Sequence, residues 1–510
     1  MQPLVQFSGS SIQLLPRTAA GPAQPAASAM NRVQPGNYLQ LIHDKLRRQP
    51  EQVCLVWPTA DGEQAVSYTG GELLHRVAAG REKLLAQKVR AGQAVLLAVP
   101  VSVELVGGLL AVLALGAVPV LPPAGATPKQ LMELTRQLNI RVVLMAAPSR
   151  LLRLAAWLRG LRLVAADCPP GPVALDWVAV AVPPEQAALV SHSSGSTGRP
   201  KAIRRSHAVL RAQHETIKAA FPPWAGQRDF PLFPNILLHN LAAGVVSVLP
   251  AVPWHNLRQL DPARVVAQIQ RERVQTLTGN VCYFARLLAY LREHPVDLPD
   301  VVAVGVGGSP VPEPLAQALR RAFPGAAVHV IYGSSEAEPI AVRPVTSEAP
   351  DPLLGYCVGA IRPELEWRFE PLGTLHVGAA GQMVGELWVR GAHVATAPGQ
   401  WLRTGDYGYV AAGQLYLTGR QGNARLHRGV QHFQVEHLLQ HRPGVEQVAA
   451  RADAAGFTVL VHGSVSTEDV AEFLAQHLPD VPLVGIRRCA ALPLDARHHS
   501  KILYDQLQSL

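Results

Sequence analysis

An uncharged apolar run from Leu105 to Pro122 constrains the fold of this chain more than any other stretch. The run is long enough to raise the question of a membrane span, but glycines interrupt it, Glu104 flanks it and a Pro-Pro pair closes it. With the residues before it, the run divides into a strand (AVLLAVPV), a helix (VELVGGLLAVLALG) and a second strand (AVPVLPP). Strands this apolar are typically buried on both faces, so we predict a parallel sheet covered by helices and no membrane span.

The same alternation of strands and helices continues along the chain. It predicts a doubly wound α/β domain, in which residues 327–339 (AVHVIYGSSEAEP) form one strand. Between residues 352 and 418 the pattern changes to short strands (LEWRFEP, GTLHVGA, GELWVRG, GQLYLTG), which indicates a smaller β-rich portion packed on the α/β body. A chain of 510 residues exceeds one ordinary core. We therefore expect an N-terminal domain over residues 30–419 and a compact α+β domain over residues 420–510.

Composition excludes several classes of protein. Hydrophobic residues make up 48% of the chain and charged residues 16%, which suits a large globular enzyme. The net charge of +9 is dispersed without a run of five or six cations, so a nucleic-acid-binding arm is not expected. The five cysteines are isolated and form no CxxC pair, which argues against a zinc ribbon or a disulfide framework and favours a reducing cytoplasm. Residues 1–29 carry Arg17 as their only charge and lack the pattern of a secretory signal, so we expect a disordered leader.

Residues 193–201 (SSGSTGRPK) concentrate hydroxyls, glycines and cations directly after an apolar segment. Hydroxyl groups and glycine amides can surround an anion closely, and Lys201 adds a positive charge suited to phosphate. The spacing is not the Walker pattern, because Arg199 and Pro200 separate the last glycine from the lysine. From local chemistry alone, a phosphate-binding loop and a flexible Gly/Ser linker are equally plausible.

The stretch SSGSTGRPKAI resembles the phosphate loop of the adenylate-forming superfamily, which contains acyl-CoA synthetases, nonribosomal adenylation domains and luciferases. Five further blocks follow in the family's order, so the resemblance covers roughly residues 38–510 and is nearest to fatty-acyl-CoA ligase-like AMP-binding enzymes. The resemblance implies a large N-terminal domain, a small mobile C-terminal domain, and ATP and Mg²⁺ as cofactors. The loop residues that it assigns to phosphate binding are Ser193, Ser194, Gly195, Ser196, Thr197, Gly198 and Lys201.

The other blocks supply the remaining candidate residues. By resemblance, Tyr332 offers a flat face to adenine, the Ser335 hydroxyl reaches the α-phosphate and Glu336 holds Mg²⁺. Asp406 binds the ribose hydroxyls, and Arg420 contacts the nucleotide as a planar cation. Residues that line the nucleotide by the same resemblance are Gly307, Gly308, Ser309, Gly333 and Ser334.

Lys501 stands where the family has its catalytic lysine, although Ser500 replaces the usual glycine before it. Gly422 occupies the place of the family's acidic hinge residue, and glycine leaves the backbone free to rotate there. The block around Gly429 and Glu436 lacks the usual Ile-Lys, which leaves the contacts to coenzyme A open.

The acyl group is expected between the segments HNLAAGVVSVLP and GNVCYFARLL, both of which are apolar. Pro234 replaces a family histidine, and His239 either lines this pocket or packs in the core. Gly279 is a candidate for opening the depth of the pocket. By the same resemblance, members that activate amino acids place an aspartate in this segment for the α-amino group. The HNLAAG segment has no acidic residue, so the resemblance favours a fatty or aryl acid over an amino acid.

The resemblance implies ATP-dependent activation of a small carboxylic acid through an acyl-adenylate, with release of pyrophosphate. Transfer to a thiol follows, with coenzyme A or an acyl carrier protein as the acceptor. Two alternatives stay open: a β-lactone-forming synthetase that acts on a β-hydroxy acid, and a non-catalytic relative that binds nucleotide or acyl ligand.

Overall fold

The computed structural model describes residues 36–59, 62–123, 125–167, 176–193, 201–233, 236–254, 256–378, 380–495 and 500–509, and the side chains of 193, 508 and 509 are not part of that description. The leader expected over residues 1–29 lies outside this range. Within the described part, no helix is both long enough and apolar enough to cross a membrane.

The apolar run forms part of a six-stranded sheet, as predicted. The strand order is β6-β5-β3-β4-β7-β8, and all neighbours are parallel except β7 and β8. Helix α3 follows β3 and is capped by Ser102, whose hydroxyl accepts a hydrogen bond from the amide of Leu105. The elements are β3 (Ala94–Ala98), α3 (Val103–Ala114), β4 (Val118–Val120), α4 (Pro128–Gln137), β5 (Val142–Met145), α5 (Arg150–Trp157), β6 (Arg162–Ala165), β7 (Ala187–Ser193) and β8 (Lys201–Ser206), with α2 (Gly70–Ala86) packed on α3.

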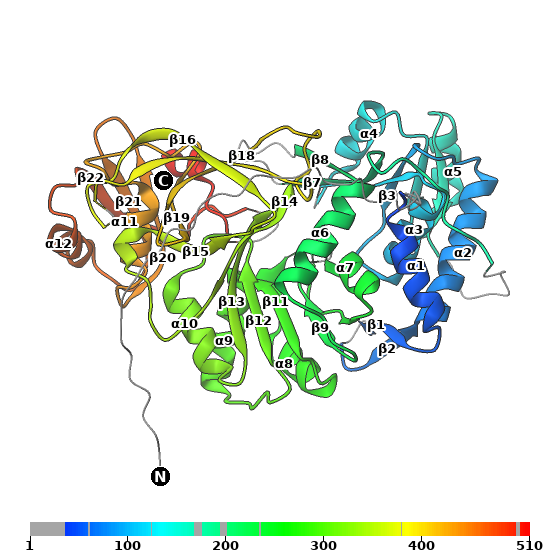
Figure 1. Ribbon diagram of the computed structural model, residues 1–510, viewed down its shortest axis with the longest axis horizontal. Helices are drawn as coiled ribbons and strands as arrows, with labels where there is room; N and C mark the ends of the chain where they lie inside the picture. The colour runs from blue at the N-terminus through cyan, green and yellow to red at the C-terminus, as the bar shows by residue number, and fades with distance from the viewer. Residues whose placement is uncertain are drawn as a thin grey trace, which may run out of the picture. The chain divides into compact units, whose positions relative to one another are not determined.

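A second, thirteen-stranded sheet has the order β16-β17-β18-β19-β15-β14-β13-β12-β11-β9-β10-β1-β2. Its central strands β9 to β13 are parallel, and helices α9 and α10 pack along β11, β12 and β13 (Figure 1). The elements of this part are α1 (Leu39–Arg48), β1 (Val53–Pro58), β2 (Ala65–Thr69), α6 (His207–Ala220), β9 (Arg228–Pro231), α7 (Ile236–Ala243), β10 (Val246–Val248), η1 (Leu257–Gln259), α8 (Pro262–Arg271), β11 (Thr276–Asn280), α9 (Val281–Glu293), β12 (Ala303–Gly307), α10 (Glu313–Ala322), β13 (Ala327–Ser334) and β14 (Ala337–Pro344).

The central strands have two different faces, because successive side chains of a strand point in opposite directions. Leu277, Val304 and Val328 face helices α9 and α10 and belong to one buried hydrophobic core. The alternate residues, such as Thr278 and Gly305, line a cavity on the side of α6 and α7. The sheet therefore packs on one face and leaves space on the other.

The single strand predicted over residues 327–339 is wrong. The chain reverses between β13 and β14, which pair antiparallel. The hydroxyl of Ser334 accepts the amides of Glu336 at 3.2 Å and Ala337 at 3.3 Å. These local bonds satisfy the backbone in the turn and so compete with continuation of the strand.

The β-rich portion expected over residues 352–418 is hydrogen-bonded into the large sheet. Strand β15 pairs with β14 on one side and with β19 on the other. Of residues 373–379, predicted as a separate strand, Gly373 and Thr374 form the end of β16, and 375–378 lie outside the strands that the structure describes. The strands are β15 (Tyr356–Ile361), β16 (Glu366–Thr374), β17 (Met383–Arg390), β18 (Leu402–Ala411) and β19 (Gln414–Arg420), and the 3-10 helix η2 (Pro352–Leu354) precedes them.

The C-terminal part is a smaller α+β unit with a core of its own. Its three-stranded sheet has the order β20-β21-β22, and its buried cluster includes Leu438, Phe457 and Leu474. Asn423 joins the start of this part to β20, because its amide group bonds to the backbone of Ala450 and Ala452. The elements are α11 (His432–Leu439), β20 (Val445–Ala452), β21 (Phe457–Gly463), α12 (Thr467–His477), β22 (Leu483–Arg488) and η3 (Tyr504–Ser509).

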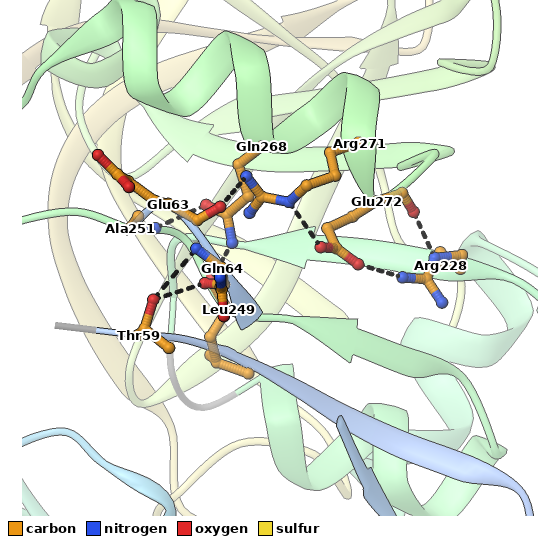
Figure 2. A network of polar contacts seen from close by, with 9 residues as sticks. All are labelled: Thr59, Glu63, Gln64, Arg228, Leu249, Ala251, Gln268, Arg271 and Glu272. Atoms are coloured by element: carbon orange, nitrogen blue, oxygen red, sulfur yellow. Dashed lines mark hydrogen bonds and ion pairs between the residues drawn. The ribbon is translucent and has the colours of Figure 1, made fainter. Parts of the chain in front are cut away.

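A polar network fixes the turn between β1 and β2 against helix α8 (Figure 2). Arg271 donates to the carbonyl of Glu63 at 2.9 Å and pairs with Glu272. Glu272 also forms an ion pair with Arg228 of β9, with 2.9 Å between Nη2 and Oε2. The Arg228 side chain is thereby held on the α8 side of its strand (Figure 2).

Candidate functional site

Two adjoining cavities lie at the carboxyl ends of β12 and β13. The small cavity, of about 150 Å³, includes Ser309, Tyr332, Asp406, Arg420 and Tyr504 in its wall. The large cavity, of about 370 Å³, runs between the open face of β9, β11, β12 and β13 and helices α6 and α7. Residues that line both cavities are Gly308, Ile331, Gly333, Ser334 and Lys501.

The structure brings together three residues predicted to bind nucleotide. Tyr332 on β13 donates its hydroxyl hydrogen bond to Oδ2 of Asp406 at 2.7 Å. Oδ1 of Asp406 pairs with the guanidinium of Arg420, which lies opposite it on the neighbouring strand β19. Burial and the adjacent Asp406 carboxylate hold the pKa of Tyr332 well above its usual value, so the phenol keeps its proton. The cluster presents an aromatic ring, a carboxylate and a fixed cation to one cavity.

The turn at Ser335 and Glu336 lies beside Lys201. Nζ of Lys201, the first residue of β8, is 3.8 Å from Oε1 of Glu336. The carbonyl of Ser335 accepts two hydrogen bonds from Arg205, at 3.0 and 2.7 Å, and Arg205 also donates to Ser191 at 3.1 Å. Arg205 is only 5% exposed and was not predicted from the sequence. It connects the strands on either side of residues 194–200 to the turn that carries Glu336.

Lys501 lies in the wall where the two cavities meet. Its backbone amide donates to Oδ1 of Asp495 at 3.0 Å, and its carbonyl accepts the amide of Asp495 at 2.9 Å. Asp495 is 2% exposed, and sequence analysis did not select it. These bonds, with the bridge between Leu494 and Ile502, hold the segment that positions Lys501.

Gly307 and Gly308, here called the glycine block, lie at the end of β12 and bring the backbone close to the cavities. A side chain at Gly307 is excluded, because its Cβ would lie 2.3 Å from the carbonyl oxygen of Ile331. Gly308 has a φ of +82°, a conformation that side-chain-bearing residues rarely adopt. Oγ of Ser309 is buried in the small cavity and has no hydrogen-bond partner among the described residues. A buried hydroxyl without a partner is suited to a ligand.

His239 lines the large cavity, but Gly279 is not among the residues that line it. A Cβ at Gly279 would meet ring carbons of Tyr283 at 2.6 Å and Phe284 at 3.1 Å, so this glycine allows close packing of α9 and does not open the cavity. Gly305 contributes to the cavity wall in its place. Gly305 lies between Val304 and Val306 in the strand, so it faces the opposite side of the sheet from these two apolar residues. This alternation in the sequence could have identified it.

Two further candidates lie near the start of the C-terminal part. Gly422 has a φ of +91°, and a Cβ there would have only Oδ1 of Asp505 within 4 Å. Glu436 on α11 is buried in the wall of the small cavity and accepts the Tyr504 hydroxyl at 2.9 Å. Burial raises the pKa of Glu436 to about 8.

Most of the predicted phosphate loop lies outside the described residues. Ser194, Gly195, Ser196, Thr197 and Gly198 lie outside the described residues, as does the side chain of Ser193. The described ends of β7 and β8 bring Ser193 opposite Lys201 in an antiparallel pair. The strands before and after the loop are therefore adjacent, and Lys201, the first described residue after it, lies beside Glu336.

The family described as AMP-binding enzyme matches residues 42–397, which is more than half of the chain. The chain belongs to the AMP-binding enzyme family. The matched range includes the loop at residues 193–201 and the turn at Glu336, whereas Asp406, Arg420 and Lys501 lie beyond it.

Individual relatives include an olefin beta-lactone synthetase of Stenotrophomonas maltophilia, which is 31% identical over 372 residues. That match covers 63% of this chain and 66% of the relative. A 4-coumarate–CoA ligase-like protein of Oryza sativa is 29% identical over 61% of this chain and 59% of its own length. The matches thus span 66% and 59% of these two relatives' lengths, less than two thirds in each case.

Solved structures share the fold. The O-succinylbenzoate coenzyme A synthetase of Bacillus subtilis in complex with AMP superposes with a TM-score of 0.73 at 20% identity, over 92% of this chain and 98% of that one. The anthranilate CoA ligase AuaEII in complex with anthranoyl-AMP gives a TM-score of 0.77 at 18% identity, over 93% and 96% of the two chains. The mixed α/β architecture with a large N-terminal and a smaller C-terminal domain is confirmed by these neighbours.

Proposed function

We propose that the protein is an ATP-dependent ligase that activates a carboxylic acid. The acid's carboxylate attacks the α-phosphate of ATP, an acyl-adenylate forms and pyrophosphate leaves. The observation that carries this proposal is the position of Lys501, which lines both the small cavity with the Tyr332–Asp406–Arg420 cluster and the large cavity with its apolar wall. A cation at that junction lies between the two reacting groups.

The residues at the junction supply what this reaction needs. A carboxylate and a phosphate repel one another, so an enzyme must place cations and amides where they approach. Lys501 bridges the acid and the α-phosphate, and Lys201 with the loop before it neutralises the departing pyrophosphate. Asp406 accepts hydrogen bonds from the ribose hydroxyls, while Arg420 fixes the direction of its carboxylate. The ring of Tyr332 forms a wall for adenine.

The Glu336 carboxylate suits a magnesium ion bound together with substrate phosphates. No group of three or more His, Cys, Asp or Glu side chains in the described ranges forms a complete protein cage for a metal. Mg²⁺ commonly binds through one or two carboxylates plus phosphate oxygens, which is what Glu336 and ATP offer. The ion, when bound, neutralises phosphate charge. Glu336 holds its position through the turn that Ser334 and Arg205 stabilise.

The thiol acceptor is coenzyme A or the phosphopantetheine of a carrier protein. Rotation of the C-terminal part about Gly422 withdraws Lys501 after adenylation and admits the thiol.

Cys54, Cys282, Cys357 and Cys489 are free thiols in the structure, which supports our proposal of a reducing, cytoplasmic location.

A second candidate is a synthetase that forms a β-lactone. The 31% identity to an olefin beta-lactone synthetase favours this candidate. In this reaction the β-hydroxyl of the substrate attacks its own acyl-adenylate carbonyl, AMP leaves, and no thiol takes part.

ATP–pyrophosphate exchange across a panel of carboxylic acids tests adenylation, and added coenzyme A or carrier protein distinguishes the acceptors. Lys501→Ala is expected to reduce exchange by roughly a hundredfold or more, because a transition-state cation is lost. Exposed Lys218→Ala is the control and should leave exchange unchanged. Undiminished exchange in Lys501→Ala, or no exchange with any acid in the wild type, contradicts the proposal.

A further inference from the structure

The large cavity contains a buried carboxylate that the sequence did not reveal as part of the site. Asp229, the second residue of β9, lines this cavity and is 6% exposed. Its Oδ1 accepts the Thr276 hydroxyl at 2.6 Å, and its Oδ2 accepts the Asn240 amide at 2.8 Å. Both neighbours orient the carboxylate without neutralising it.

Asp229 has no ion-pair partner within the described ranges of the chain. The adjacent Arg228 cannot serve, because it pairs with Glu272 on the α8 side of the strand (Figure 2). Burial raises the pKa of the Asp229 carboxyl above its usual range, although the hydrogen bonds from Thr276 and Asn240 act in the opposite direction. A buried acid without a cation is costly, and a ligand that donates to it lowers this cost.

Two other residues of the cavity wall, Thr278 and His239, each carry a buried polar atom. Oγ1 of Thr278 and Nδ1 of His239 have no hydrogen-bond partner among the described residues. His239 is 8% exposed, and burial together with neighbouring His214 lowers its pKa to about 3, so the imidazole is neutral at pH 7. Buried polar atoms are nearly always hydrogen-bonded in complete structures. The cavity therefore combines an apolar lining with three polar groups suited to a ligand.

Strand register places Asp229 away from the end of the sheet at which Gly308 and Lys501 line both cavities. Asp229 lies opposite Thr276 on β11, whereas the residue opposite Gly307, at the end near both cavities, is Asn280. Asn280 is four positions beyond Thr276 on the strand, which corresponds to roughly 13 Å at about 3.3 Å per residue. A group that reaches Asp229 is thus distant from the carboxylate that reacts beside Lys501.

We propose that Asp229, Thr278 and His239 recognise a hydrogen-bond donor, an amine or a hydroxyl, at the distal end of the substrate's acyl group. This inference rests on the proposed carboxylate-activating function and narrows the expected fatty or aryl acid to one with a polar far end. The donor bonds to Asp229, and the Thr278 hydroxyl bonds to the same substituent. The β-hydroxyl of a β-hydroxy acid lies next to the carboxylate and does not reach this position.

The test compares three straight-chain acids of equal length that end in a methyl, a hydroxyl or an ammonium group, across a homologous series. ATP–pyrophosphate exchange yields kcat/KM for each acid. The wild type is expected to favour one donor-bearing acid over the methyl-terminated acid by roughly 10- to 100-fold, as for hydrogen bonds to a charged group. Preference for the ammonium or for the hydroxyl acid identifies which donor is bound.

Asp229→Asn is expected to remove most of that preference and to leave kcat/KM for the methyl-terminated acid within about threefold. Thr278→Val, which has the same shape without the hydroxyl, is expected to weaken the preference to a smaller extent and decides the matter if Asp229→Asn does not fold. The control is Asp300→Asn, an exposed acid paired with Arg273.

Two outcomes overturn the inference and leave the proposed function intact. In the first, the wild type has at every chain length a kcat/KM for the methyl-terminated acid that equals or exceeds the kcat/KM for the donor-bearing acids. In the second, both Asp229→Asn and Thr278→Val keep the wild-type preference for a donor-bearing acid over the methyl-terminated acid. Absence of exchange with every acid instead removes the proposed function and this inference with it.

Discussion

Arg205 donates two hydrogen bonds to the backbone carbonyl of Ser335, at 2.7 and 3.0 Å. A buried guanidinium thus stabilises the turn that presents Glu336, and its third bond, to Ser191, reaches the strand before the predicted phosphate loop. The position of Glu336 therefore depends on a residue that need not contact substrate.

We predict that Arg205→Met lowers the free energy of unfolding by about 1–3 kcal/mol, because buried acceptors lose their donor. Pyrophosphate exchange should fall by roughly tenfold or more, with an increased requirement for Mg²⁺, since Glu336 is less well positioned. Denaturant titration and exchange at varied Mg²⁺ measure the two effects. Arg204→Met, an exposed neighbour, is the control. An unchanged Mg²⁺ requirement would show that Arg205 acts on stability alone.

Asp406→Asn should raise KM for ATP by roughly tenfold or more and leave KM for the acid nearly unchanged. The substitution removes the negative charge that pairs with Arg420. It also alters the carboxylate whose Oδ2 accepts the hydrogen bond of the Tyr332 hydroxyl. Tyr332→Phe removes one hydrogen bond but keeps the ring, so a smaller rise of about two- to tenfold is expected. Steady-state kinetics with each substrate varied in turn separates the constants. A rise in KM confined to the acid is incompatible with a ribose site.

Glu436 should make stability fall as the pH rises. The pKa of Glu436 is about 8 in the folded protein, whereas the ordinary pKa of a glutamate, taken for the unfolded chain, is 4.5. Between these two pH values the folded state therefore holds a proton that the unfolded state releases. Stability is then fully present below about pH 4.5 and lost as the pH passes 8. We expect a loss of up to about 1.4 kcal/mol for each pH unit between 6.5 and 8.

Urea denaturation of wild type and Glu436→Gln across that interval measures this slope, which the variant should flatten. The comparison begins at pH 6.5 because buried histidines such as His432, whose pKa burial lowers to about 3, act in the opposite direction below it. Glu446→Gln, at an exposed position, is the control. Equal slopes in wild type and Glu436→Gln refute the assignment.

Gly422→Pro should separate the two half-reactions. Proline fixes φ near −65°, whereas Gly422 has φ +91° in the arrangement in which Lys501 lines both cavities. Adenylate formation should fall by roughly a hundredfold, while thiolysis of supplied acyl-adenylate persists. Gly413→Pro, at a glycine with φ +74° in the β18–β19 turn, controls for local strain. Parallel loss of both half-reactions only in Gly422→Pro argues against a hinge.

Tyr332, Asp406 and Arg420 could be predicted from the sequence because each stands in a block that resembles a block of the family. Antiparallel pairing of β18 with β19 places Asp406 opposite Arg420, and the Tyr332 hydroxyl reaches the same carboxylate from β13. Asp229 escaped prediction because it lies near the start of a strand, where an acid is usually solvated. Only the register with β11 reveals that it points into the cavity.

Arg205 and Asp495 were missed for a different reason. Arg205 bonds to the backbone of Ser335, and Asp495 bonds to the backbone of Lys501. Because every residue type has the same backbone groups, the sequence of the partner does not indicate such a bond. The reversal after β13 was missed because the apolar pattern of residues 337–342 continues that of β13. Local hydrogen bonds of Ser334, and not hydrophobicity, set that boundary.

The division of β11 into two functional ends suggests a practical route to new substrates. Thr276 and Thr278 can be varied to change what the far end of the large cavity accepts, while Asn280 and the adjoining glycine block stay untouched. Because one hydrogen-bonded strand carries both ends, their spacing stays constant as the side chains change. Libraries confined to the far end should thus retain the activation chemistry and alter only the choice of acid.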